Sequence, residues 1–243
     1  MTFLTRYTDD RSSPALGSAL RDLVVRATAP AIVVWLAVVG LGLLIKGPFG
    51  GLNSEDTISR DVQRTRTPVW DTVTMVWSHI GNTEIVIGVC VLVVGVLWWR
   101  TRQWWLAVVP AVAIALQATI FVIATAVVGR PRPHVPHLDP APPTSSYPSG
   151  HVGASTALYL SFALLAQRVE HTWLRRLVTT ACLLIPVLVA WARLYRGMHH
   201  LSDILIGAAN GVACALLAWG YLRRRVAPLG NTAARRPSDA ASA

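Results

Sequence analysis

Six stretches of the chain are apolar and long enough to cross a membrane, and they limit the possible folds more than any other feature. A helix needs about 20 residues to span a hydrocarbon core ~30 Å thick. Hydrophobic residues make up 53% of the 243 residues and charged residues only 14%, which is too apolar for an ordinary soluble domain. We therefore predict an all-α membrane protein with six transmembrane helices. The expected spans are residues 28–45, 83–99, 104–128, 150–166, 176–194 and 201–222.

The distribution of basic residues predicts how these spans are oriented. Lys and Arg are retained on the cytoplasmic side of membrane proteins. If the N-terminus is inside, 14 of the 22 Lys and Arg residues fall on the inner side and 8 on the outer side. We predict a multi-pass protein of the cell membrane with both termini in the cytoplasm. The chain then divides into a cytoplasmic segment 1–27, a six-span domain 28–222 and a basic, disordered cytoplasmic tail 223–243.

The net charge of +10 is explained by the same distribution. Basic residues at inner helix ends serve topology and contact anionic lipid headgroups, so the charge does not indicate a nucleic-acid partner. The three cysteines, Cys90, Cys182 and Cys214, lie within predicted spans, where thiols pack as small apolar groups. Their spacing indicates neither a disulfide nor a metal site, and we predict no cofactor.

Two connections between the spans are long. Residues 47–82 carry mixed charge, and their apolar residues are spaced as in amphipathic helices, so we expect interfacial helices there. Residues 129–147 contain six prolines. Because proline restricts the backbone and lacks an N–H donor, this second connection is expected to be irregular and stiff.

Two polar clusters stand where predicted spans begin and end. Pro148, Ser149, Gly150 and His151 open the fourth span, and Arg193, His199 and Asp203 lie around the end of the fifth span and the start of the sixth. Ionisable groups are costly near hydrocarbon, so such a set indicates a functional site. The predicted topology places both clusters at the extracytoplasmic membrane interface.

The second cluster has the residue types of a nucleophilic centre. On a helix, His199 and Asp203 would share one face, and the carboxylate would accept a hydrogen bond from one imidazole nitrogen. The other nitrogen would then be free to act as a nucleophile or base. The planar guanidinium of Arg193 suits two phosphate oxygens. We interpret the adjacent His200 as structural, with contact to a lipid headgroup as the alternative.

The first cluster has the features of an anion site. Ser149 and Gly150 open a helix whose unpaired N–H groups and dipole favour an anion. His151, in the first turn, would face the same anion and could protonate a leaving oxygen. Arg130 and Arg132 follow the third span and add two guanidinium groups on the same side. The two clusters converge on a phosphate, and no residue set suits a metal.

These residues resemble the signature motifs of the type 2 phosphatidic acid phosphatase superfamily. Pro148–His151 and the spacing of Arg193, His199 and Asp203 are similar to the second and third motifs, and Arg132 with the proline after it is similar to the end of the first. The motifs cover residues 120–210, and the six-span layout extends the resemblance over most of the chain. The resemblance implies that residues 28–222 form an integral membrane lipid phosphatase.

The resemblance also implies a role for each residue. It predicts metal-independent hydrolysis of a phosphomonoester or pyrophosphate through a phosphohistidine intermediate. His199 would attack phosphorus, Asp203 would orient His199, and His151 would protonate the leaving alkoxide. The residues expected to hold the phosphoryl oxygens are Arg132, Ser149, Gly150 and Arg193.

Two positions depart from the motifs of the superfamily. Thr125 stands where the first motif has a lysine, and Ala192 stands where a serine often precedes the arginine of the third motif. We predict that Arg130, two residues before Arg132, supplies the missing positive charge to the phosphate.

The predicted function is hydrolysis of a lipid phosphate or polyprenyl diphosphate that reaches the site laterally from the outer leaflet. Undecaprenyl and other polyprenyl diphosphates, phosphatidylglycerol phosphate and phosphatidic acid are all candidate substrates, and the sequence does not choose among them or indicate an oligomeric state. Two alternatives stay open. The protein could transfer the phosphoryl group to a lipid or sugar acceptor, or it could bind or transport a lipid phosphate without catalysis.

Overall fold

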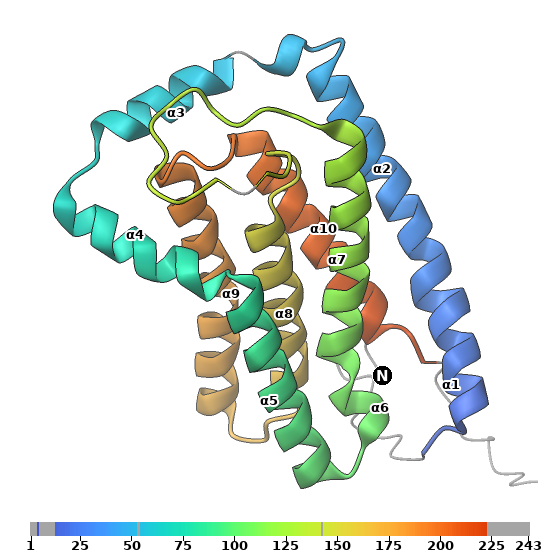
Figure 1. Cartoon of the computed structure of the whole chain (residues 1–243). Coiled ribbons are helices and arrows are strands. Elements are labelled where there is room, and N and C mark those ends of the chain that lie inside the picture. The colour runs from blue at the N-terminus through green and yellow to red at the C-terminus, as the bar shows by residue number, and fades with distance from the viewer. Residues whose placement is uncertain (1–3, 5–12, 53, 142, 223–243) are drawn as a thin grey trace, which may run out of the picture.

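The computed structural model describes residues 4, 13–52, 54–141 and 143–222, and all regular elements in this part of the chain are helices (Figure 1). The predicted tail 223–243 lies outside the described residues. The elements are α1 (Leu16–Leu23), η1 (Val24–Thr28), α2 (Ala29–Lys46), η2 (Gly50–Leu52), α3 (Ser54–Arg64), α4 (Pro68–Ile80), α5 (Thr83–Thr101), α6 (Trp104–Ala107), α7 (Val109–Val128), α8 (Gly150–Ala166), α9 (Thr172–Tyr195) and α10 (Leu201–Trp219).

The long helices run side by side as a bundle, which confirms the all-α membrane fold (Figure 1). Five of them are long and apolar enough to cross a bilayer: Leu16–Lys46, Thr83–Thr101, Trp104–Val128, Thr172–Tyr195 and Leu201–Trp219. The sixth expected span corresponds to α8, which is apolar but has only 17 residues. The count of six therefore stays a prediction. α8 packs against α7, α9 and α10, and most of its residues are buried.

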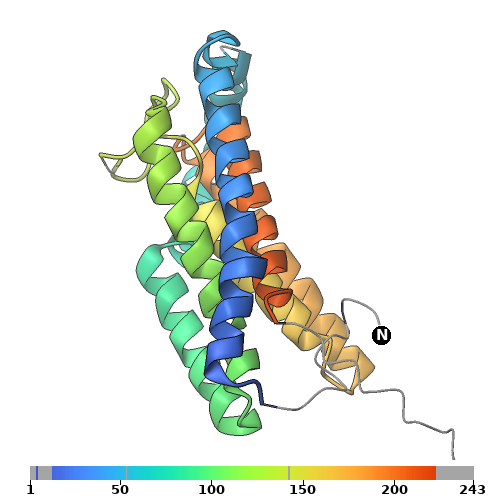
Figure 2. The same ribbon diagram turned by 90° about the vertical axis from the view of Figure 1, so that its right-hand side faces the viewer.

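The first membrane helix begins earlier than the sequence predicted. It starts at Leu16 rather than at residue 28 and runs the height of the bundle (Figure 2). The charged residues Arg21 and Arg26 do not interrupt it. A π-helical turn, Val24–Thr28, precedes Pro30 near the start of α2. Because proline has no N–H to donate to the preceding turn, a locally wider helix keeps the chain continuous there.

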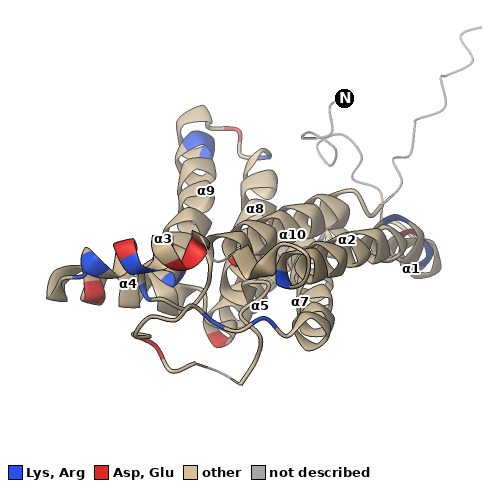
Figure 3. Cartoon of the chain, turned by 90° about the horizontal axis from the view of Figure 1, so that it is seen from above, with Lys and Arg blue, Asp and Glu red and all other residues tan. Residues whose placement is uncertain are grey.

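The helices expected in residues 47–82 are present as α3 and α4 between α2 and α5. α3 and α4 cross one end of the bundle, and α4 packs against α9 (Figure 1). Seen from above, α3 carries acidic and basic residues and α4 carries one acidic residue, Asp71, whereas the helices below them are mostly uncharged (Figure 3). The proline-rich segment between α7 and α8 has no helix or strand in its described residues, as predicted. α3, α4 and this segment together cover the end of the bundle at which α8 and α10 begin.

Close packing between α8 and α10 depends on glycine. A Cβ atom at Gly207 would lie 2.5 Å from the carbonyl oxygen of Ser149, and one at Gly211 would lie 2.5 Å from the carbonyl oxygen of Gly153. Small residues let helix backbones approach each other where hydrocarbon gives no hydrophobic driving force. The glycines therefore hold the start of α8 directly against α10, where the two polar clusters lie.

We predict that Gly211→Ala destabilises the protein, because the new methyl group would meet backbone atoms of α8 that cannot move independently. Overpacking of this kind costs about 1 to 3 kcal/mol, so the midpoint of thermal unfolding in detergent should fall by several degrees. The matched control is Gly95→Ala on α5, where a Cβ atom has no neighbour within 4 Å. An equal response of the two variants would contradict glycine-dependent packing.

Candidate active site

A cavity of about 410 Å³ lies between α5, α7 and α8 and reaches the ends of α8 and α9 that carry the polar clusters. Its polar lining includes Arg132, His151, Arg193 and His199, four of the eight residues predicted for the site, and Gly150 is a fifth. The other part of its wall is apolar. The apolar lining residues are Val86, Ile87, Ile114, Ala118, Phe121, Val122 and Ala154.

His199 is buried in this wall and is held by the backbone of the preceding loop. It is 3% exposed, and its Nδ1 atom lies 2.6 Å from the carbonyl oxygen of Ser146. A carbonyl oxygen only accepts hydrogen bonds, so Nδ1 carries the proton and Nε2 has a free lone pair. The structure thus gives His199 the tautomer of a nucleophile.

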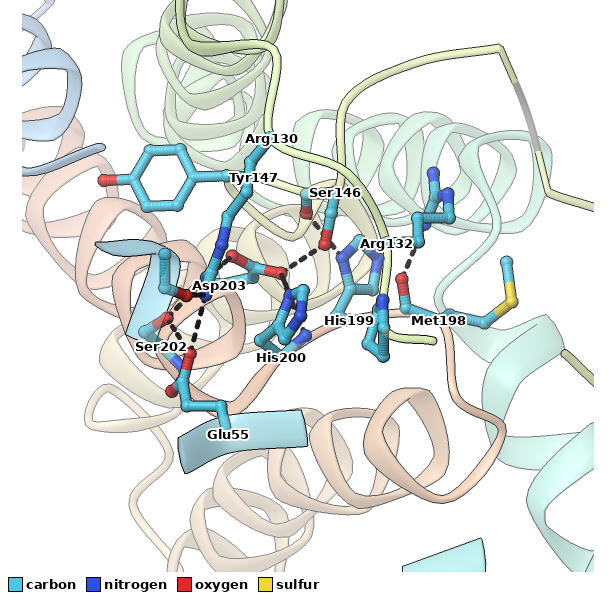
Figure 4. Close-up of polar contacts among 12 residues, drawn as sticks. Glu55, Arg130, Arg132, Ser146, Tyr147, Met198, His199, His200, Ser202 and Asp203 are labelled. Atoms are coloured by element: carbon cyan, nitrogen blue, oxygen red, sulfur yellow. Dashed lines mark hydrogen bonds and ion pairs between the residues drawn. The ribbon is translucent and has the colours of Figure 1, made fainter. Parts of the chain in front are cut away.

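The predicted hydrogen bond between His199 and Asp203 is wrong. α10 begins at Leu201, so His199 precedes the helix, and the spacing rule for one helix face does not apply to it. Asp203 instead accepts hydrogen bonds from the Ser146 hydroxyl and from the backbone N–H of His200, and its ring contact is with His200 Nδ1 at 3.2 Å (Figure 4). Asp203 therefore positions His199 through Ser146, whose carbonyl oxygen holds the His199 ring.

His200 has a structural part in this arrangement, as predicted. It is the N-cap residue of α10, and it forms a capping box with Asp203, the third residue of the helix. Its Nε2 atom lies 3.4 Å from Asp56 on α3. The ring thereby connects the start of α10 to the helix that covers it.

The pKa of His199 lies well below its ordinary value. Burial is the largest cause, and the charges of Arg193 and Arg132 act in the same direction, whereas the Asp203 carboxylate and the hydrogen bond to Ser146 oppose them. A depressed pKa keeps the imidazole neutral at physiological pH. His199 therefore has a free Nε2 lone pair under ordinary conditions.

Arg130, which was predicted to contact the phosphate, does not line this cavity. Its Nη1 atom lies 2.6 Å from Asp203 Oδ1, and its Nη2 atom lies 2.9 Å from Glu55 Oε2 (Figure 4). Nη1 also donates to the Ser202 hydroxyl, and Nη2 donates to the Gly51 carbonyl oxygen. The side chain is 2% exposed. Arg130 thus neutralises two buried carboxylates, and its contacts in the structure do not include the cavity that His199 lines.

Arg132 presents its charge to the cavity. Its guanidinium donates to the carbonyl oxygens of Met198, at 2.7 Å, and Thr144, at 3.4 Å, and no described carboxylate pairs with it. Burial lowers the pKa of Arg132, and the nearby Asp203 opposes that change, but a guanidinium remains protonated. An uncompensated cation in a half-buried cavity wall favours an anion.

Arg193 shares one carboxylate with a second arginine. Its Nη1 atom lies 2.9 Å from both Asp139 Oδ2 and the Ser78 hydroxyl, and Arg196 Nη2 lies 2.7 Å from Asp139 Oδ1. Burial raises the pKa of Asp139, but hydrogen bonds from Arg196 and Ser78 and the charges of both arginines bring it below its ordinary value. One carboxylate for two guanidinium groups leaves net positive charge, and the buried Nε atom of Arg193 has no described partner.

The start of α8 supplies the remaining groups of the site. Gly150 is the first residue of the helix, and a Cβ atom there would lie 2.9 Å from the Phe121 ring, so glycine lets this ring pack directly against the start of α8. His151 lines the cavity, and its Nε2 atom lies 3.0 Å from Asn82 Oδ1. The Ser149 hydroxyl is buried with no hydrogen-bond partner in the described structure, and Ser149 does not line the cavity. An unpaired donor beside a helix N-terminus is compatible with anion binding.

Sequence reasoning missed the residues that hold these groups in place. Ser146, Asn82, Glu55 and Asp139 belong to loops or to the start of α3, and each meets a partner more than 50 positions away. Among these residues, only Glu55 and Asp139 could have been inferred, because the two acids lie at the same end of the bundle as an excess of arginines. Nothing in the sequence distinguishes Ser146 from the serine before it.

The fold is an all-helical membrane fold in which two histidines and two arginines line one cavity. Such a site is suited to bind a phosphate at a membrane. Residues 105–227 match the PAP2 superfamily, which is just over half of the chain, and the protein belongs to that superfamily. It is therefore a membrane lipid phosphatase, as the motifs implied. No curated protein sequence matches the chain.

Two solved structures share the fold. The crystal structure of a transmembrane PAP2-type phosphatidylglycerolphosphate phosphatase from Bacillus subtilis has a TM-score of 0.68 at 18% sequence identity, over 81% of this chain and 96% of that one. Aquifex aeolicus LpxE has a TM-score of 0.54 at 18% identity, over 67% of this chain and 92% of that one.

We predict different outcomes for two neighbouring arginines. Arg130→Ala leaves Glu55 and Asp203 buried without their cation, which costs about 3 to 5 kcal/mol, so the unfolding temperature in detergent should fall sharply. Arg132→Ala removes only contacts to carbonyl oxygens from the wall of the cavity. It should unfold near the wild-type temperature and lose roughly ten- to a hundredfold in kcat/KM. Wild-type stability of Arg130→Ala together with a raised KM would instead assign Arg130 to substrate binding.

Proposed function

We propose that the protein hydrolyses a lipid phosphate or diphosphate without a metal, through a phosphohistidine formed on His199. The observation that carries this proposal is the geometry of His199, whose Nδ1 proton is held by the Ser146 carbonyl oxygen at 2.6 Å in a cavity that also contains two arginines. A neutral imidazole with one fixed nitrogen is a competent nucleophile at phosphorus.

In the first step His199 Nε2 attacks phosphorus, and the bond between phosphorus and the lipid oxygen breaks. Arg132, Arg193 and the backbone N–H of Gly150 bind the phosphoryl oxygens, where charge is concentrated in the transition state; all three residues line the cavity. His151 lines the same cavity and donates a proton to the leaving lipid oxygen. In the second step His151 takes a proton from water, the water attacks phosphorus, and the N–P bond breaks to release inorganic phosphate and free His199.

Lateral access from the bilayer is supported by the apolar part of the cavity. Ile87 on α5 and Val122 on α7 both line it, and they are 49% and 59% exposed on the outer surface of the bundle. An apolar opening between two membrane helices suits a lipid tail, which then keeps its contact with hydrocarbon while its phosphate reaches His199. Phosphatidylglycerol phosphate, phosphatidic acid and polyprenyl diphosphates such as undecaprenyl diphosphate all have this layout.

The mechanism predicts a covalent intermediate on one histidine. Wild-type protein mixed rapidly with 32P-labelled lipid phosphate should carry acid-labile, alkali-stable label, and free phosphate should follow it. His199→Ala should reduce both signals to background, His151→Ala should slow release at least a hundredfold, and His171→Ala should match wild type because it lies at the opposite end of α9. Label that accumulates in an acceptor lipid and not as phosphate would identify a phosphotransferase. Binding of lipid without label on the protein would identify a non-catalytic binding protein.

The proposed orientation places both termini in the cytoplasm and the site outside. α1 begins and α10 ends away from the end of the bundle that α3 and α4 cross (Figure 1). The basic excess at the helix ends and turns near the termini supports this orientation.

Cysteine labelling tests the orientation, because the native cysteines are buried. In intact cells an impermeant maleimide should label Pro140→Cys, in the exposed loop above the cavity, but should label Glu170→Cys, in the exposed turn between α8 and α9, only after permeabilisation. The reverse pattern would place the site in the cytoplasm.

A further inference from the structure

Asn82 is the N-cap residue of α5, but its side chain does not cap that helix. An asparagine in this position usually accepts a hydrogen bond from a backbone N–H group of the first turn, which stabilises the helix. Here the side-chain oxygen Oδ1 lies instead 3.0 Å from Nε2 of His151, the residue that we propose as the proton donor. Asn82 therefore forgoes a stabilising local bond and contacts a catalytic histidine on another helix.

The turn between α4 and α5 has the shape that this contact requires. A Cβ atom at Gly81 would lie 2.8 Å from Val189 Cγ1 and 3.2 Å from His151 Cβ, so glycine lets the turn pack directly on the histidine. The same Cβ position is 3.4 Å from His151 Cδ2. The ring edge formed by Cδ2 and Nε2 therefore faces Gly81 and Asn82.

The other ring nitrogen of His151 is open to the cavity. Nδ1 lies across the ring from the edge that faces the turn, and no described residue forms a hydrogen bond with it. The atom is accessible, since it is not one of the buried unpaired polar atoms of the described structure. Because His151 lines the cavity, Nδ1 is the nitrogen that a bound substrate can reach.

The contact with Asn82 determines which nitrogen of His151 exchanges a proton. An amide oxygen only accepts hydrogen bonds, so Nε2 carries the proton of the neutral ring and Nδ1 has the lone pair. When Nδ1 takes a second proton, Nε2–H still donates to Asn82, and this bond is stronger from an imidazolium than from a neutral ring. The proton that is gained and lost is therefore the one on Nδ1.

We propose that Asn82 is a positioning residue that holds His151 as the Nε2–H tautomer, so that Nδ1 exchanges the proton of the reaction. In the first step the Nδ1–H bond breaks, its proton joins the leaving lipid oxygen, and the ring becomes neutral. In the second step Nδ1 takes a proton from the attacking water. This inference rests on the proposed function and adds to it the atom that transfers the proton and the residue that orients it.

Asn82 is the direct hydrogen-bond partner of His151 among several charged groups. Four other titratable side chains act on the His151 ring from neighbouring elements: Arg193 on α9, Arg132 and Asp139 in the segment before α8, and His79 on α4. The cationic groups disfavour an imidazolium, and the one carboxylate that favours it is already paired with Arg193 and Arg196. No described carboxylate forms a hydrogen bond with His151, so the Asn82 oxygen is the acceptor that stabilises its charged form.

The sharpest test compares two substitutions that both suit a helix N-cap. Asn82→Asp keeps an oxygen within reach of His151 Nε2, whereas the side chain of Asn82→Ser is too short to reach it. Formation of the phosphohistidine on His199 is followed after rapid mixing with 32P-labelled phosphatidic acid at a series of pH values. Asn82→Ser should slow this step about ten- to a hundredfold without weakening lipid binding, and Asn82→Asp should stay within a few-fold of wild type.

The pH dependence of the same step gives a second signature. The step needs a proton on Nδ1, so its rate falls at high pH as His151 loses that proton. A carboxylate beside the ring favours the imidazolium, so in Asn82→Asp this fall should move to higher pH by about one unit or more. Asn82→Ser and Asn82→Leu lack the acceptor, and the fall should move to lower pH. A merely structural role would leave the pH profile where it is.

The leaving group separates proton donation from folding. Nitrophenolate leaves without being protonated, so hydrolysis of p-nitrophenyl phosphate does not depend on a general acid. Asn82→Ser and Asn82→Leu should therefore lose at least tenfold less activity on p-nitrophenyl phosphate than on phosphatidic acid. Wild-type behaviour of Asn82→Ser, or an equal loss on both substrates with an unmoved pH profile, overturns the inference.

A spectroscopic measurement keeps the inference distinct from the proposed chemistry. In His199→Ala protein with 15N-labelled histidine, the signals of His151, assigned by their loss in His151→Ala, should show a protonated Nε2 and an unprotonated Nδ1 in the neutral ring. Asn82→Leu should abolish this preference. If wild type releases no phosphate but the tautomer is present, the proposed hydrolysis fails and the contact stands. If phosphate is released but the neutral ring is protonated at Nδ1, the contact fails and the hydrolysis stands.

Discussion

The site depends on one buried guanidinium. Arg130 lies between the carboxylates of Asp203 and Glu55, with nitrogen-to-oxygen distances of 2.6 and 2.9 Å. Taking these charges out of water costs several kcal/mol for each ion, and their attraction offsets that cost only when the hydrogen-bonding geometry is complete. Here it is nearly so, because Ser202 and Gly51 accept the other hydrogen bonds of Arg130. The ion pairs join the segment after α7, the start of α10 and α3 into one unit.

This unit determines what His199 can do. Asp203, already bound to Arg130, also accepts the hydroxyl of Ser146, and the Ser146 carbonyl oxygen holds His199 at 2.6 Å. The carboxylate therefore contacts His199 only through Ser146, whose backbone carbonyl oxygen fixes the orientation of the His199 ring. Arg130 is paired with two carboxylates, whereas Arg193 shares one carboxylate with Arg196 and Arg132 has no carboxylate partner among the described residues. The protein separates structural cations from the cations that face the cavity.

The sequence predicted several parts of the molecule well. Hydrophobic runs of about 20 residues located the long helices, since a helix must have a minimum length to cross the hydrocarbon core. The motif spacing predicted that His151, Arg132, Arg193 and His199 share one site, and all four line one cavity. The contact between His199 and Asp203 was predicted wrongly because a four-residue spacing was treated as helical, whereas the helix begins only at Leu201. The early start of the first helix was missed because its charged residues sit in an otherwise amphipathic segment.

The sequence by itself determined the membrane class, the helices and a set of residue types suited to a phosphate. These follow from local properties, namely hydropathy, segment length and spacing along the chain. Tertiary structure alone decided which arginine is paired with carboxylates and which faces the cavity. Arg130 and Arg132 are two residues apart, yet only Arg130 meets Glu55, 75 positions away. The energy of a charge depends on the burial and partners around it, and those partners come from distant parts of the chain.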